Sequence, residues 1–211
     1  MIGDVVESRR IEHRAEAQKR LQDLLSFLNG AFSNSLLAPF SLSRGDEIQA
    51  LVLRGAIVPD VLWEVMIRFP HSPIRFGFGL GELSTPLSPL PMETDGPAWW
   101  AARKAVENAA ATRRHGGVWQ GFGNADRVLT ALGTLLAHMR GRLTLRQRGV
   151  LEQLRSGADM VQVAERLGIS KQAVSGIVAA AGWRAYQEGE DAWRSLLGEY
   201  DYTDGWTHGR H

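Results

Sequence analysis

Hydrophobic residues follow two periods along this chain. Short runs alternate apolar and polar positions, which predicts strands, and longer runs repeat the apolar positions at helical spacing. Glycine, proline and asparagine separate the runs. The predicted elements are a strand at 1–6, a helix at 9–32, strands at 40–43 and 47–53, a helix at 58–69, a strand at 74–83, and helices at 96–114 and 125–139.

This order, β-α-β-β-α-β-α, is typical of a split β-α-β arrangement. We therefore expect an α+β fold, with a ferredoxin-like antiparallel sheet that carries its helices on one face, followed by an all-α domain. The predicted divisions are a sheet domain at 1–120, a connecting or dimerisation helix at 121–141, a helical domain at 142–197 and a flexible tail at 198–211.

Three glycines alternate along the strand predicted at 74–83, at Gly77, Gly79 and Gly81. Because side chains on a strand point alternately to its two faces, these glycines share one face. A strand that is bare on one side invites a close approach by a helix, another backbone or a ligand. Spacing alone leaves core packing and ligand approach both open.

The last third of the chain carries a helix-turn-helix pattern. Its predicted helices span 144–155, 160–167 and 170–181. Thr144 and Ser170 are suited to cap the first and third helices. Ala164 lets two helices approach closely, and Gly168 tolerates the left-handed backbone of a tight turn. The pattern resembles the helix-turn-helix of sigma-factor region 4 and related bacterial regulators.

The start of the third predicted helix leaves polar side chains exposed. In a helix-turn-helix such side chains meet base edges in the major groove, while nearby arginines meet phosphates. The expected partner is double-stranded DNA, bound by a homodimer, and the alternative is a three-helix protein–protein module. The candidate DNA-binding residues are Ser170, Lys171, Gln172, Ser175, Gly176, Arg146 and Arg148.

Aromatic residues follow this pattern at helical spacing. Trp183, Tyr186 and Trp193 predict a fourth helix. We expect it to seal the small helical domain.

Charge is uneven along the chain, although the net charge is only +1. Residues 141–185 carry seven basic and three acidic side chains, whereas residues 186–211 carry two basic and six acidic ones. The basic segment suggests contact with a polyanion, and chance clustering of solvated arginines is the alternative. The chain has no cysteine, which excludes disulfides and thiolate metal sites. No apolar run approaches the roughly 20 residues of a membrane span, so we expect a cytoplasmic protein.

Four ordered segments of the first half, at 3–9, 44–49, 74–83 and 95–103, together resemble the SatD family of bacterial proteins over about residues 2–115. Their order in turn resembles the palm-like core of class III nucleotidyl cyclases and GGDEF cyclases. In those enzymes, carboxylates from the first strand and the hairpin hold two divalent cations that bind a nucleoside triphosphate.

This resemblance implies candidate site residues. Mg²⁺ or Mn²⁺ would be the cofactor, because hard cations prefer carboxylate and phosphate oxygens. Three interpretations stay open: structural turn residues, binding without turnover, and catalysis. The implied metal ligands are Asp4, Asp46 and Glu47, and the implied nucleotide-binding residues are Gly3, Gly45 and Arg103.

The sequence therefore predicts a DNA-binding transcriptional regulator. Its SatD-like domain would sense a ligand, a nucleotide or divalent metal among the candidates, or would dimerise. One alternative is a Mg²⁺-dependent nucleotidyl cyclase or transferase that is regulated by its C-terminal module. Another is an interaction protein that makes its contacts through Trp99, Trp100 and the helix at 125–139.

Overall fold

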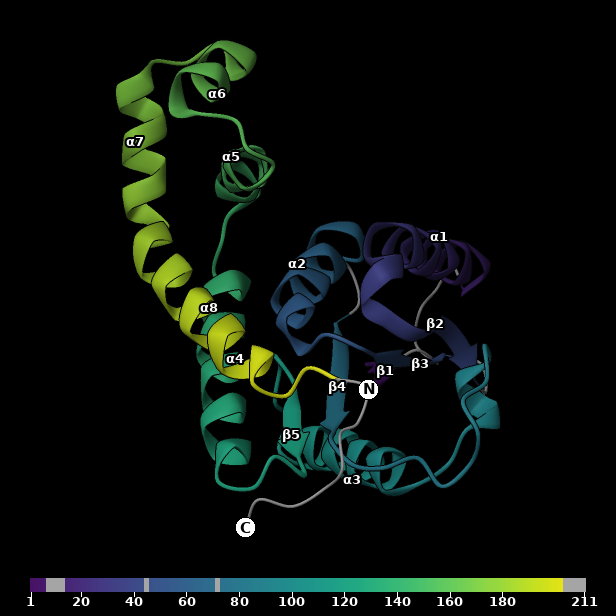
Figure 1. The fold of residues 1–211 in the computed structure, drawn as a ribbon. Helices are drawn as coiled ribbons and strands as arrows, with labels where there is room; N and C mark the ends of the chain where they lie inside the picture. Colours follow the sequence, from purple (N-terminus) through teal and green to yellow (C-terminus); the bar gives the residue numbers. More distant parts are fainter. Residues whose placement is uncertain (7–13, 44–45, 71–72, 203–211) are drawn as a thin grey trace.

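A five-stranded sheet is the centre of the fold. The computed structural model describes residues 1–6, 14–43, 46–70 and 73–202, and its strands follow the order β2-β3-β1-β4-β5 (Figure 1). The strands are β1 (Ile2–Val5), β2 (Leu36–Ser43), β3 (Glu47–Val52), β4 (Ile74–Gly79) and β5 (Val118–Gln120). The α-helices are α1 (Arg14–Phe32), α2 (Val58–Arg68), α3 (Pro97–Ala111), α4 (Ala125–Gly141), α5 (Leu145–Arg155), α6 (Met160–Leu167), α7 (Lys171–Ala180) and α8 (Trp183–Gly198). The predicted α+β fold is confirmed.

The first four strands pair as the sequence predicts. Strands β2, β3, β1 and β4 pair with one another in antiparallel, in the ferredoxin-like order. Strand β5 was not predicted. It pairs in parallel with β4, with Trp119 opposite Phe78, so the complete sheet is mixed rather than wholly antiparallel. A strand of three residues is too short for alternation to reveal it.

Helices cover both faces of the sheet, which corrects the expectation of one covered face. Helices α1 and α2 share a core with Ile48 and Phe76 of the sheet. Helix α3 packs on the opposite face, where Ala102 and Val106 meet Ile2.

The alternating glycines of β4 allow α3 to lie directly on the strand. A Cβ atom at Gly77 would lie 2.3 Å from both the carbonyl oxygen of Ala102 and the nitrogen of Val106. One at Gly79 would lie 2.2 Å from the carbonyl oxygen of Ala98. The expected close approach is therefore made by a helix backbone.

Helix α8 completes the core of the sheet domain. The Trp193 ring is fully buried, with its centroid 5.8 Å from that of Trp119 on β5. The Trp183 ring lies 5.6 Å from the Trp63 ring of α2. These aromatic residues join α8 to the core of the sheet domain, and Leu151 of α5 belongs to the same core cluster. The predicted seal of the small helical domain is therefore only part of what α8 covers. The spacing of the aromatic residues predicted a buried helix face but could not indicate what covers it.

Helices α5, α6 and α7 form a three-helix unit between α4 and α8, and Figure 1 shows this unit projecting from the sheet domain. A small core of its own holds it together, centred on Val150, Val163, Ala164 and Val174.

After α8 the chain returns to the sheet domain. The Asp201 carboxylate accepts a hydrogen bond from the Gly55 nitrogen at 2.7 Å. The rest of the tail, from 203 onward, lies outside the described residues. In the described ranges, no helix is both long and apolar enough to cross a membrane.

The contact between α3 and β4 predicts the effect of adding one methyl group. Gly77→Ala places a Cβ against backbone atoms that cannot move without displacing α3. We expect the free energy of unfolding to fall by about 3 kcal/mol, measured by denaturant titration.

Gly30→Ala is the matched control. Gly30 is an exposed residue of α1, and nothing lies within 4 Å of the position that a Cβ atom would take there. Because alanine favours a helix more than glycine, we expect this change to be neutral or to stabilise by up to about 1 kcal/mol. Equal losses in the two variants would contradict the packing described here.

Candidate functional site

A charged group lies on the α3 face of the sheet, where β1 ends. Asp4 stands opposite Glu47 of β3 and Arg75 of β4 in the strand register. The Asp4 carboxylate accepts two hydrogen bonds from Arg75, from Nε at 2.9 Å and from Nη2 at 2.8 Å. This bidentate geometry is the strong form of the arginine–carboxylate pair.

Glu47 binds a second guanidinium. Arg103 reaches across from α3 and donates through both of its Nη atoms, with the Nη2 contact at 2.8 Å. The hydrogen bond to Glu47 is the main cause that raises the pKa of Arg103. Gln49 also donates to the Glu47 carboxylate, at 2.8 Å.

The fold thus brings some of the predicted nucleotide-binding and metal-binding residues together, but not all of them. Asp4, Glu47 and Arg103 share one region, but Gly3 faces the other side of the sheet, where a Cβ would lie 2.6 Å from the Phe76 ring. Asp46 is the turn residue before β3, and Gly45 lies outside the described residues. Sequence reasoning missed Arg75, because only the strand register places it beside Asp4.

This arrangement pairs each of the two carboxylates with a guanidinium. A divalent cation bound to Asp4 or Glu47 would have to compete with Arg75 and Arg103 for the same oxygens. The binding of Mg²⁺ or Mn²⁺ and of a nucleotide here stays a prediction.

The second candidate site is the surface of the three-helix unit. Thr144 begins α5 in a capping box with Gln147, and the Ser170 hydroxyl caps α7 by accepting from the Ala173 nitrogen. Between α6 and α7, Gly168 adopts a left-handed backbone with φ of 62°, as its position predicted. Ala164 is buried between the helices, also as predicted.

The candidate contact residues divide into two groups. The residues at the start of α7 are exposed to solvent, and so is Arg146 of α5. Arg148 is only half-buried, and its Nε atom is buried without a hydrogen-bond partner among the described residues. The exposed α7 residues are Ser170, Lys171, Gln172, Ser175 and Gly176.

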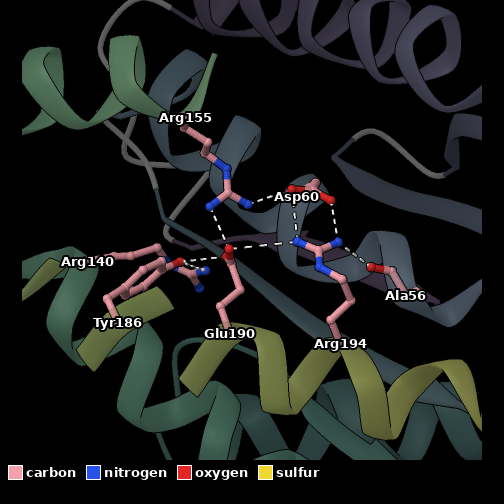
Figure 2. A network of polar contacts seen from close by, with 7 residues as sticks. All are labelled: Ala56, Asp60, Arg140, Arg155, Tyr186, Glu190 and Arg194. Carbon is pink, nitrogen blue, oxygen red and sulfur yellow. Dashed lines mark hydrogen bonds and ion pairs between the residues drawn. The ribbon is translucent and has the colours of Figure 1, made fainter. Parts of the chain in front are cut away.

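A network of ion pairs fixes the three-helix unit to the sheet domain (Figure 2). At the end of α5, Arg155 donates to Glu190 of α8 at 2.6 Å and to Asp60 of α2 at 2.5 Å. Arg194 of α8 also binds Asp60, at 2.6 Å, and donates to the carbonyl oxygen of Ala56 at 2.7 Å. The carboxylates of Asp60 and Glu190 therefore join α2, α5 and α8, which are separated in the sequence.

Tyr186 extends this network into the core. Its hydroxyl donates to Glu190 at 3.0 Å and accepts from Arg140 of α4 at 3.2 Å. Burial is the main cause that raises the pKa of Tyr186 to about 12. Because the Glu190 side chain is only 6% exposed, its charge depends on these partners for stabilisation.

Together, these features define an α+β protein in which a ferredoxin-like sheet carries a firmly attached three-helix unit. The family model described as the SatD family matches residues 1–197, so the chain belongs to the SatD family. The match continues through α8, well beyond the resemblance at 2–115 that the sequence motifs indicate. Searches of curated proteins and of solved structures found no match.

The network predicts a large effect from removing one buried charge. In Glu190→Gln the side chain keeps its shape but no longer neutralises Arg155. We expect the free energy of unfolding to fall by about 3 kcal/mol in a denaturant titration.

Glu188→Gln is the control on the same helix. Glu188 pairs with Arg184, and the two side chains are 67% and 92% exposed. Exposed pairs of this kind contribute little, so we expect a change of about 0.5 kcal/mol or less. If Glu190→Gln were as mild as this control, the network would not be what anchors the unit.

Proposed function

We propose that this SatD-family chain is a transcriptional regulator that binds double-stranded DNA, and that α5–α7 is its helix-turn-helix. The observation that carries the proposal is the exposed start of α7. Lys171 and Gln172 face solvent in the first turn of a helix that is held on α6 by the tight turn at Gly168. A recognition helix presents its N-terminal side chains to the major groove in this way.

The charge of the unit supports this assignment. The candidate base-contacting residues need arginines or lysines nearby to meet phosphates. Arg146 is exposed on α5, and the segment at 141–185 has four more basic than acidic side chains. The Ser170 hydroxyl occupies one amide group at the start of α7, and the remaining amide groups of a helix start can bind a phosphate.

The rest of the proposal concerns the sheet domain. This domain would sense a ligand, support a homodimer, or do both. The protein would act in the cytoplasm, where the DNA lies. A dimer suits a helix-turn-helix, because two half-sites one helical turn apart present the same groove twice. The SatD family model matches both the sheet domain and the three-helix unit, which supports a joint function of these two parts.

DNA binding is tested with the full chain and a labelled mixed-sequence duplex of about 30 base pairs, across a salt series from about 50 to about 200 mM. We expect affinity to fall steeply as salt rises, because phosphate contacts release counterions. Lys171→Gln should weaken binding and, if Lys171 contacts a phosphate, reduce the salt slope by about 1.

Lys104→Gln is the charge-matched control. Lys104 is an exposed lysine on α3, so this change removes the same charge far from the proposed interface, and DNA affinity should stay unchanged. Fluorescence anisotropy measures both variants. Absent binding at the lowest salt, or equal losses in the two variants, would contradict the proposal.

A further inference from the structure

A cavity of about 750 Å³ lies where the sheet domain meets the α4–α5 junction. Its apolar wall comes from the end of α2 and from β4, with Met66, Phe69, Ile74 and Phe76 among the lining residues. The volume lies within the range of small-molecule sites, which are commonly apolar with a few polar groups. The cavity does not involve the charged group at Asp4 or the exposed start of α7.

The polar part of the lining is strongly basic. Two histidines, His115 and His138, join five arginines, and the described lining residues include no carboxylate. The arginines come from the loop after α3, from the end of α4 and from α5, so three separate segments direct cations toward one space. They are Arg113, Arg114, Arg140, Arg142 and Arg148.

This lining differs from the other charged regions of the molecule. Seven arginines elsewhere form ion pairs with carboxylates in the described chain. In the described parts of the structure, none of the five cavity arginines forms such a pair, and Arg140 instead donates to the Tyr186 hydroxyl. Clustered cations without counter-charges attract anions.

Arg148 gives the most direct indication that the cavity binds an anion. Its Nε atom is buried and has no hydrogen-bond partner among the described residues, and its side chain lines the cavity. A buried donor without a protein partner is costly, and a bound water, ion or ligand that accepts a hydrogen bond from it would remove this cost. Arg113 adds to this, because its backbone holds a positive φ of 52°, a conformation that is strained for arginine and recurs at ligand sites.

From these observations we infer that the cavity binds a small organic anion, with an apolar or aromatic body against α2 and β4 and a phosphate, sulfonate or carboxylate group among the arginines. The inference rests on the proposed function and deepens it by naming the class of ligand that the sheet domain senses. Because Arg148 belongs to the first helix of the three-helix unit, the ligand would contact both parts of the chain.

The probe is 1-anilinonaphthalene-8-sulfonate, which joins an aromatic body to an anion and fluoresces when it is bound in an apolar site. We expect saturable binding to the full chain without DNA. Arg148→Gln should raise the Kd about tenfold, since a hydrogen bond to a charged group is lost. Arg127→Gln, at an exposed position of α4 outside the described cavity lining, should leave the Kd unchanged.

An uncharged probe with the same aromatic body, N-phenyl-1-naphthylamine, separates charge from shape. Arg148→Gln should not weaken its binding. Arg142→Gln, a second cavity variant at an exposed position, should also weaken the sulfonate probe alone, so the test does not depend on one variant folding. Displacement by 1-naphthyl phosphate and by 1-naphthoate then shows which anionic group is preferred.

The proposal is overturned if the Arg148 and Arg127 variants bind the sulfonate probe equally. It is also overturned if both probes bind more weakly to the Arg148 and Arg142 variants. Because no DNA is present, this outcome is distinct from a failure of the proposed DNA binding. Sulfonate binding that is lost only in the cavity variants supports the assignment, whatever the DNA measurement gives.

Discussion

The carboxylate of Glu190 joins the two parts of this molecule. It is buried on α8 and binds Arg155 at the end of α5, while the same guanidinium binds Asp60 on α2. Burying these charges is costly unless each has a partner, so the helices are held in the one arrangement that pairs them. The three-helix unit is thereby fixed at the end of its first helix.

The connections of the unit add to this constraint. The chain enters it from α4 and leaves it into α8, and both of these helices belong to the core of the sheet domain. The exposed start of α7 therefore lies on a unit that is held at both ends and by ion pairs. In our proposal, this attachment lets the sheet domain influence how the unit meets DNA. The basic cavity lies at the same junction, where Arg148 of α5 faces residues of α2 and β4.

Local patterns predicted much of the helical unit, because caps and turns depend on neighbouring residues. The bounds of α6, the cap at Ser170 and the left-handed Gly168 all follow from side chains within a few positions. Alternating glycines likewise predicted a close approach to β4, though not that α3 makes it.

Features that depend on distant segments were missed. They include the short strand β5, the packing of α8 on α2 and the pairing of Asp4 with Arg75. The sequence also placed Arg148 among the DNA contacts, while its buried Nε atom and its place in the cavity lining emerge only from the fold.

The central claim is that the start of α7 meets DNA, and amide chemical-shift mapping of the full chain with a short duplex tests it most directly. The account predicts that the largest shifts fall on residues 170–176, with smaller ones near Arg146, and that the amides of α3 are unaffected. Shifts confined to the sheet domain, or the absence of shifts at a DNA concentration that saturates binding, would contradict it.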